Sequence, residues 1–334
     1  MKQILAIGTG GTIASEPELD GLSPELTADQ LLGQVPKIRE FCQVDCIQPF
    51  CIDSTNMSPA HWLRIAGCIR ERFWQYDGFV IIHGTDTMAY TAAAISYLIQ
   101  SSPKPIVLTG AQRPIGSDNT DSKMNLEDAF RCACSELSGV MIVFNGKVIL
   151  GTRARKTHTK SFRAFSSINY PELAYIQDGH VLSFIRPEHG GIPIFYDKLN
   201  DQVALLKMIP GTDSCLLKYM LEHNDAIIIE SFGVGGMPSY EGTEFYDILK
   251  AGILCGKIIV MTTQVENEGS DLSVYSVGSR LKTDLRVLEA YDMTTEAVVA
   301  KLMWILGQTN DPEKVRHLFY TPVAQDLLYP VSGV

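Results

Sequence analysis

Three short motifs carry the residue types that nucleophilic catalysis by a hydroxyl group requires. The first, Gly-Thr-Gly-Gly-Thr, ends in Thr12, and its glycines would let backbone N–H groups approach a substrate closely while presenting the Thr12 hydroxyl. The second, His-Gly-Thr-Asp-Thr, holds Thr85 beside Asp86, whose carboxylate could bind a substrate ammonium while Thr85 takes part in catalysis. In the third, Gly-Thr-Arg-Ala-Arg-Lys, a desolvated Lys156 could accept a proton from a hydroxyl.

Each of these motifs also has a purely structural interpretation. The glycine-rich bend could be a tight turn, and Asp86 could cap a helix that begins near Thr87. The charged run that contains Lys156 could simply face solvent. His83 is a candidate general base by its chemistry. We interpret it as structural, because it ends an apolar strand and no serine or cysteine nucleophile motif accompanies it.

A fourth motif, Asp53-Ser54-Thr55, could hold a substrate carboxylate through hydroxyl and N–H groups, or could cap the helix that follows. Nucleotide-binding patterns do not fit: the third glycine of a dinucleotide motif would fall at Ile13, and no phosphate-binding P-loop pattern occurs. The eight cysteines form no Cys-x-x-Cys pair, which favours free thiols that pack in the fold. The sequence therefore predicts no metal site and no cofactor.

The elements that must position these motifs alternate between short apolar β-type runs and helical stretches. This alternation predicts an α/β fold with buried parallel strands. In such a sheet the ligand lies beyond the carboxyl ends of the strands, where the motifs of Thr12 and Thr85 stand and where Gly110-Ala111-Gln112 follows a third strand. The predicted strands are 4–7, 79–82, 106–109, 140–144, 204–208, 226–230 and 258–262. The predicted helices are 58–76, 87–100, 125–136, 214–222 and 294–308.

The segment 184–202 contains prolines and paired glycines without a clear hydrophobic period, so it is the best candidate for a linker. This choice predicts an N-terminal catalytic α/β domain over residues 1–183 and a C-terminal α/β domain over residues 203–334.

The composition excludes several classes of protein. The 38 Asp and Glu outnumber the 28 Lys and Arg, so the formal net charge is −10, and no basic stripe offers the phosphate contacts that a nucleic-acid partner needs. No apolar run approaches the ~20 residues of a membrane span, and the first residues lack the features of a leader peptide. We therefore expect a cytoplasmic protein with a small-molecule substrate and with no nucleic-acid or membrane partner.

Taken together, the motifs resemble the bacterial L-asparaginase family, and specifically its cytoplasmic type I branch. The likeness rests on segments in the same order and spacing: residues 9–13 (TGGTI), 53–57 (DSTNM), 77–91 (DGFVIIHGTDTMAYT), 151–156 (GTRARK), 231–236 (SFGVGG) and 294–308. The resemblance implies hydrolysis of asparagine to aspartate and ammonia without metal or cofactor. It also implies a two-domain α/β subunit, with a larger N-terminal domain and a smaller parallel-sheet C-terminal domain, in a homotetramer built as a dimer of dimers.

The resemblance also implies roles for individual residues. By position, Thr12 matches the nucleophile that forms the acyl-enzyme. Thr85 matches a hydroxyl that handles protons or water with the support of Lys156 and Asp86. Asp86 and Ser54 also match the groups that hold the α-amino and α-carboxylate ends of the substrate.

Two details complete this assignment. Asp53 and Thr55, on either side of Ser54, belong to the predicted substrate-binding set. Many relatives carry a tyrosine in the loop after the first threonine motif, whereas residues 16–25 contain none and have Leu22 near that place. The group that activates Thr12 is therefore open.

Three alternatives remain. A glutaminase or a relaxed asparaginase/glutaminase would share the motifs, because one methylene changes pocket discrimination by only ~1–3 kcal/mol. The related amidotransferase subunit that acts on charged transfer RNA shares the threonine motifs, although the resemblance associates it with an extra N-terminal domain. A non-catalytic amino-acid-binding protein would not need Lys156 behind Thr85.

Overall fold

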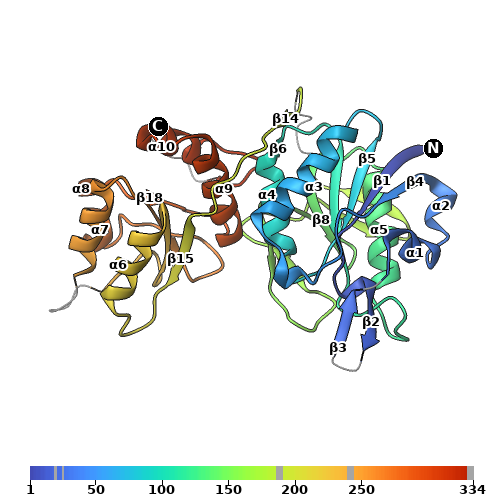
Figure 1. Cartoon of the computed structure of the whole chain (residues 1–334), viewed down its shortest axis with the longest axis horizontal. Coiled ribbons are helices and arrows are strands. Elements are labelled where there is room, and N and C mark those ends of the chain that lie inside the picture. The colour runs from blue at the N-terminus through green and yellow to red at the C-terminus, as the bar shows by residue number, and fades with distance from the viewer. Residues whose placement is uncertain (19–20, 25, 186–190, 239–243, 329–334) are drawn as a thin grey trace. The chain divides into compact units, whose positions relative to one another are not determined.

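The apolar runs of the sequence become the buried strands of two separate sheets, one in each of two units (Figure 1). The units are Met1–Asp197 and Lys198–Val334. The computed structural model describes residues 1–18, 21–24, 26–185, 191–238 and 244–328. The division lies within the segment 184–202, of which residues 186–190 fall outside the described residues. The domain limits given above stay predictions.

The first unit contains an eight-stranded mixed sheet in the order β13-β12-β9-β8-β7-β5-β1-β4. The five strands from β8 to β4 in this order pair in parallel, and β9, β12 and β13 continue the sheet through antiparallel pairs. Every residue of β5 and β7 is buried, as expected for strands covered on both faces. The strands are β1 (Lys2–Gly8), β4 (Cys42–Ile47), β5 (Gly78–Ile82), β7 (Pro105–Thr109), β8 (Gly139–Phe144), β9 (Lys147–Leu150), β12 (Ala174–Gln177) and β13 (His180–Ser183).

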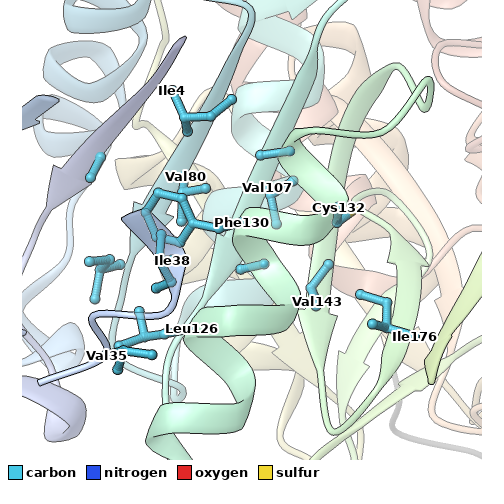
Figure 2. Close-up of a cluster of buried hydrophobic side chains, with 14 of the residues drawn as sticks. Ile4, Val35, Ile38, Val80, Val107, Leu126, Phe130, Cys132, Val143 and Ile176 are labelled. Atoms are coloured by element: carbon cyan, nitrogen blue, oxygen red, sulfur yellow. The ribbon is translucent and has the colours of Figure 1, made fainter. Parts of the chain in front are cut away.

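Helices cover both faces of this sheet, with α3 and α4 on one face and α1, α2 and α5 on the other (Figure 1). Leu126 and Phe130 of α5 pack with Val80 and Val107 of the sheet in one hydrophobic core (Figure 2). On the opposite face of the sheet, Phe79 of β5 stacks on Phe73, which directly follows α3. The helices are α1 (Ala28–Gly33), α2 (Ile38–Phe41), α3 (Pro59–Arg72), α4 (Met88–Leu98) and α5 (Ser122–Ala133).

Short elements beside the sheet carry several of the residues that the sequence singles out. Thr12 begins the 3-10 turn η1, Ser54 begins the 3-10 turn η2, and Lys156 ends β10. The pairs β2–β3, β10–β11 and β6–β14 are antiparallel. These elements are η1 (Thr12–Ala14), β2 (Ser15–Glu18), β3 (Gly21–Pro24), η2 (Ser54–Asn56), β6 (Ile99–Gln100), β10 (Ala154–Lys156), β11 (Phe165–Ser167) and β14 (Ile194–Phe195).

The second unit contains a smaller, four-stranded parallel sheet in the order β15-β16-β17-β18, which confirms the expected parallel-sheet domain. Its strands are β15 (Val203–Lys207), β16 (Ala226–Ser231), β17 (Ile258–Thr263) and β18 (Leu288–Glu289). Its helices are α6 (Ser214–His223), α7 (Phe245–Leu254), α8 (Ser276–Asp284), α9 (Thr295–Gln308) and α10 (Pro312–Tyr320). Within the described ranges, the helices are all too short or too polar to cross a membrane.

The predicted strands and helices are confirmed, although several ends differ by a few residues. The largest difference at a start is in α5, which begins at Ser122 rather than at Asn125. The prediction of parallel strands alone was incomplete, because β9, β12 and β13 extend the sheet in antiparallel register. β4 was missed because this edge strand mixes polar with apolar residues and gives no continuous apolar run.

Candidate active site

Two glycines bring the loops of the first and second threonine motifs into contact. Gly11 has a φ of 85°, and a Cβ placed on it would lie 2.3 Å from the Gly84 Cα. A Cβ on Gly84 would in turn lie 2.6 Å from the Ser54 Oγ. Only glycine fits at these two positions, because a side chain would overlap the neighbouring loop. The loops that carry Thr12, Thr85 and Ser54 are therefore packed against one another.

Backbone hydrogen bonds fix these loops to the ends of the central strands. The Thr9 N–H donates to the Ile82 carbonyl at 3.0 Å, which joins the ends of β1 and β5. The Gly11 N–H donates to the Ile52 carbonyl at 3.0 Å, and the Ile52 N–H donates to the Thr9 carbonyl at 3.0 Å. This parallel bridge holds the segment before Asp53 beside the first threonine motif. The site therefore forms beyond the carboxyl ends of parallel strands, where an α/β sheet is expected to bind its ligand.

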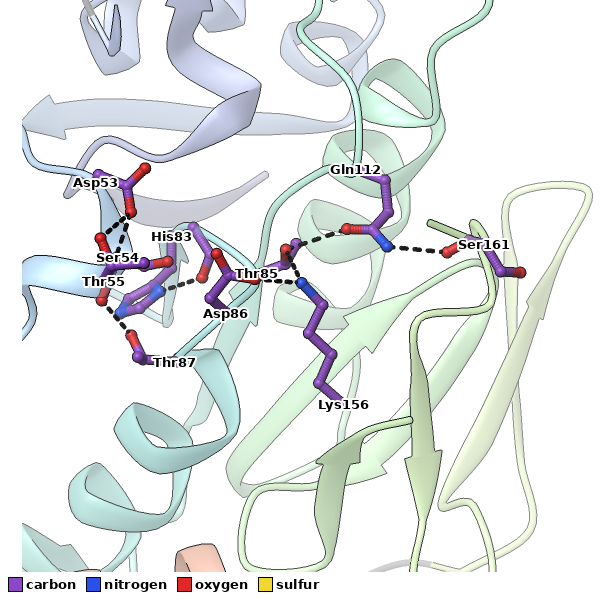
Figure 3. Close-up of polar contacts among 11 residues, drawn as sticks. Asp53, Ser54, Thr55, His83, Thr85, Asp86, Thr87, Gln112, Lys156 and Ser161 are labelled. Carbon is purple, nitrogen blue, oxygen red and sulfur yellow. Dashed lines mark hydrogen bonds and ion pairs between the residues drawn. The ribbon is translucent and has the colours of Figure 1, made fainter. Parts of the chain in front are cut away.

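Lys156 reaches from the end of β10 to both members of the second threonine motif (Figure 3). Its Nζ donates to the Thr85 Oγ1 at 2.8 Å and to the Asp86 Oδ1 at 2.5 Å. The Lys156 side chain is 16% exposed, whereas the Asp86 side chain is 57% exposed. The contact is that of an ammonium with a carboxylate. The structure thus brings together three of the four predicted catalytic residues through direct contacts.

Thr85 has a second partner, which the sequence analysis did not assign to the site. Its Oγ1 donates to the Gln112 Oε1 at 3.1 Å, and the Gln112 Nε2 donates to the Ser161 carbonyl at 3.1 Å. Gln112 follows the end of β7, and Ser161 lies in the loop between β10 and β11 (Figure 3). The sequence places Gln112 just after the end of a predicted strand, but it assigns no role to this residue.

His83 is fully buried, and its two ring nitrogens both have partners inside the fold. The Trp62 Nε1 donates to the Thr91 Oγ1 at 2.9 Å, and the Thr91 Oγ1 lies 2.9 Å from the His83 Nε2. Because a carbonyl oxygen can only accept, the His83 Nδ1 carries the ring proton and donates to the Gly84 carbonyl at 2.6 Å, and the neutral Nε2 accepts from the Thr91 hydroxyl. Burial lowers the pKa of His83 to about 4. A neutral His83 that holds the loop before Thr85 supports its interpretation as structural.

The Asp53-Ser54-Thr55 motif forms a turn in which Ser54 is buried and its two neighbours are exposed. The Asp53 Oδ1 accepts from both the Thr55 N–H and the Thr55 Oγ1 at 2.8 Å, which caps η2. The Thr87 Oγ1 donates to the Ser54 carbonyl at 2.7 Å. Ser54 is thereby held against Gly84, whereas Asp53 and Thr55 bind each other at the surface of the turn.

The alternative role for Asp86, as a helix cap, does not agree with the structure. The N-cap residue of α4 is Thr87, and the Asp86 carboxylate accepts from Lys156 instead. Thr12 is half-buried, and the hairpin of β2 and β3 follows it directly. Residues 19, 20 and 25 of the segment without a tyrosine lie outside the described residues.

The polar groups at this site are hydroxyl, amine, amide and carboxylate groups. In the part of the chain that the structure describes, no group of three or more His, Cys, Asp or Glu side chains is placed to bind a metal ion. The site offers the Thr12 hydroxyl on one loop and, on the next, the Thr85 hydroxyl in contact with a lysine.

Comparisons with known proteins find related sequences over most of the chain. The family model described as asparaginase, N-terminal, matches residues 3–188, and that of the glutaminase/asparaginase C-terminal domain matches residues 202–319. The L-asparaginase of Thermococcus kodakarensis is 38% identical over 97% of this chain and 99% of its own length. A glutamyl-tRNA(Gln) amidotransferase chain of Pyrococcus abyssi is 35% identical over 98% of this chain and 77% of its own length.

Solved structures give the same result for the fold. The thermostable L-asparaginase from Thermococcus kodakarensis superposes with a TM-score of 0.93 at 37% identity, over 98% of this chain and 100% of its own. L-asparaginase I from Vibrio cholerae superposes with a TM-score of 0.87 at 30% identity, over 98% of this chain and 99% of its own. Because the two family models between them match both units over most of their length, this chain belongs to the asparaginase family.

Proposed function

We propose that this protein hydrolyses L-asparagine to L-aspartate and ammonia through an acyl-enzyme on Thr12. The observation that carries the proposal is the contact of the Lys156 Nζ with both the Thr85 Oγ1 and the Asp86 Oδ1. A lysine that contacts a hydroxyl and a carboxylate at a strand-end site is a group that can move protons during acyl transfer. The likeness to L-asparaginases over nearly the whole chain gives the substrate.

In the first half of the reaction, the Thr12 hydroxyl attacks the side-chain carbonyl carbon of asparagine. A bond forms between the Thr12 Oγ1 and that carbon, and the bond from the carbon to the amide nitrogen breaks. The hydroxyl loses its proton, and the nitrogen gains one and leaves as ammonia. An amide is a poor electrophile, so alignment of the attacking oxygen and protonation of the leaving nitrogen must supply much of the rate.

In the second half, water attacks the ester that Thr12 forms with the aspartyl group. The new bond joins the water oxygen to the carbonyl carbon, the bond to the Thr12 Oγ1 breaks, and Thr12 regains a proton. Thr85 accepts the proton of the attacking group and passes its own hydroxyl proton to the Lys156 amine. Lys156 must therefore be neutral for part of the cycle. Lys156 and Asp86 thus support Thr85 in the proton transfers of both halves.

The substrate is held by groups at its two charged ends. The Asp86 carboxylate, which is more than half exposed, is available to bind the α-ammonium. Ser54 and the turn formed by Asp53 and Thr55 are proposed to hold the α-carboxylate through hydroxyl and N–H groups. A pocket of this kind distinguishes asparagine from glutamine only by the length of the chain between the two ends, so some glutaminase activity is expected.

We further propose that the protein is a cytoplasmic enzyme of the type I branch and assembles as a homotetramer, a dimer of dimers. The likeness to L-asparaginase I of Vibrio cholerae supports the branch. Light scattering of the purified protein would test the assembly, and a mass of one or two subunits would contradict it.

The activity is tested by ammonia release from asparagine and from glutamine at a range of concentrations. We expect kcat/KM to be higher for asparagine, with ammonia and aspartate formed in equal amounts. The Pyrococcus abyssi relative is named as a subunit of a glutamyl-tRNA(Gln) amidotransferase, so the same assay should be repeated with glutamyl-tRNA(Gln) present. Binding of aspartate without any ammonia release would contradict the proposal and favour a binding protein.

A further inference from the structure

We infer that a pocket beside α5 is a second binding site, which takes a small aliphatic amine, as its ammonium ion, on the Asp128 carboxylate. The pocket lies between α5, the loop that joins α1 to α2, and the turns that join β8 to β9 and β12 to β13. Its volume is about 700 Å³, which is within the range of pockets that hold small molecules. The residues that line it lie outside the threonine motifs, so the inference does not rest on the proposed function.

Asp128 is the unusual residue of this pocket. It lines the pocket and is only 9% exposed, yet among the described residues no hydrogen bond or ion pair reaches its carboxylate. Buried carboxylates in folded proteins are nearly always paired or hydrogen-bonded, because the loss of hydration is costly. The pocket therefore contains a carboxylate whose partner a ligand can supply.

The cations beside Asp128 are bound to a different carboxylate. The Lys37 Nζ lies 2.8 Å from the Glu127 Oε1, and the Arg131 Nη2 lies 3.5 Å from the same oxygen. Their attraction for Asp128 does not offset burial and the Glu127 charge, which together raise the pKa of Asp128 to about 6 from 3.8. The ionised form of Asp128 is thus poorly stabilised in the protein by itself, and a cationic ligand would stabilise it.

The other walls of the pocket favour an organic cation. Val35, Pro36, Met124 and Ile176 give it an apolar surface, against which methylene groups can pack. A metal ion does not fit, because within the described ranges no group of three or more His, Cys, Asp or Glu side chains is placed to bind one. An anion would be repelled by the Asp128 carboxylate. An ammonium group on a short aliphatic chain matches both the carboxylate and the apolar walls.

The direct test compares butylamine with 1-butanol, which has the same carbon chain and no charge. Isothermal titration calorimetry of the full chain at pH 7.5 and constant ionic strength measures both affinities. We expect butylamine to bind with a dissociation constant below about 5 mM, and 1-butanol to bind at least about tenfold more weakly. Equal affinities for the two probes, or no binding of either, would overturn the inference.

Two substitutions then locate the binding site. Asp128→Asn removes the charge and nearly keeps the shape, so butylamine should bind at least about tenfold more weakly to this variant. The matched control is Asp118→Asn, which removes an exposed carboxylate of the same unit away from the pocket lining. Its affinity should stay within about twofold of the wild type. Equal losses in both variants, or wild-type affinity in Asp128→Asn, would contradict binding at Asp128.

The pH dependence of the wild-type affinity is a second readout, which is available even if Asp128→Asn does not fold. A proton competes with the amine for Asp128, so a pKa of about 6 predicts that the affinity falls about tenfold from pH 7.5 to pH 5. Asp128→Asn should change by less than about twofold over this range. A wild-type affinity that does not depend on pH would overturn the inference. The other charged side chains around Asp128 and the pocket are Lys37, Lys123, Glu127, Arg131 and Asp178.

Discussion

Gly11 and Gly84 face each other so closely that a Cβ on Gly11 would lie 2.3 Å from the Gly84 Cα. Each glycine immediately precedes one of the threonines that the proposed mechanism uses. The backbone contact therefore sets how near the two threonine loops can come. The φ of 85° at Gly11 is a second reason for glycine at this position.

Gly11→Ala should disrupt the site and lower stability. The added methyl group overlaps the Gly84 backbone and strains the local conformation, so we expect the free energy of unfolding to fall by about 3 kcal/mol and most of kcat to be lost. Gly67→Ala is the matched control, because a Cβ on Gly67 of α3 meets no atom within 4 Å. That change should raise the free energy of unfolding by about 0.5–1 kcal/mol. Urea unfolding measures both, and equal stability of the two variants would contradict the account.

The candidate catalytic residues could be predicted from the sequence, because their side chains stand in short, recognisable motifs. Thr12, Thr85, Asp86 and Lys156 lie in short motifs whose order and spacing resemble a known family, and the structure brings the last three into contact. The central strands could also be predicted, because strands buried on both faces consist of continuous runs of apolar residues.

Gln112 and Ser161 could not be assigned in the same way. Their contact joins residues 49 positions apart, and Ser161 contributes its backbone carbonyl, which every residue type possesses. The packing of Gly11 on Gly84 is likewise a tertiary fact, since a glycine letter alone does not reveal which loop lies against it. Edge strands such as β13 (His180–Ser183) escaped because half-exposed strands mix polar and apolar residues.

Thr12→Ala and Thr85→Ala should each abolish most turnover and leave the fold intact, because each hydroxyl performs a separate step. Both variants should still bind aspartate, which calorimetry can measure. A loss of about tenfold in kcat corresponds to ~1.4 kcal/mol of barrier. If either variant keeps more than about a tenth of the wild-type kcat, that threonine has been misassigned.

Lys156→Met should lower kcat strongly, since it removes the partner of both Thr85 and Asp86 while preserving the length of the side chain. Lys160→Met is the matched control in the same charged run, because Lys160 is exposed. The control should change kcat by less than a factor of about 3, or ~0.65 kcal/mol. Similar losses in both variants would mean that the run acts as a general basic patch, and the assignment of Lys156 would be withdrawn.

The buried His83 should lower the free energy of unfolding as pH falls from 7 to 4. Its pKa is about 4 in the folded protein because of burial, against 6.5 for an exposed histidine. Between these values the unfolded chain binds a proton that the folded protein does not, so the free energy of unfolding falls as pH drops, by up to about 3 kcal/mol. His83→Gln should remove this dependence, whereas His180→Gln, at an exposed position, should keep it. Urea unfolding from pH 7 to 4 checks the prediction, and parallel wild-type and His83→Gln curves would refute it.

The buried Asp128 should change the free energy of unfolding with pH in the opposite direction, over a pH range that overlaps that of His83. Burial, and then the neighbouring Glu127 carboxylate, raise the pKa of Asp128 to about 6 from 3.8. Between those values the folded protein holds a proton that the unfolded chain releases, so the free energy of unfolding falls as pH rises, by up to about 2 kcal/mol after allowance for solvent screening. The wild-type curve therefore contains both terms, and each must be read as a difference between a variant and the wild type.

Asp128→Asn separates the two terms because it removes the carboxyl group and nearly preserves its shape. We expect the variant to be more stable than the wild type at neutral pH, where the wild-type protein carries a buried charge, and the difference to vanish as pH falls to about 4. The control is Asp118→Asn, at an exposed position in the same unit, which should change stability by less than about 0.5 kcal/mol at every pH. A variant less stable than the wild type at neutral pH would mean that the Asp128 carboxylate is stabilised by its cationic neighbours, Arg131 and Lys37, more than it is destabilised by burial.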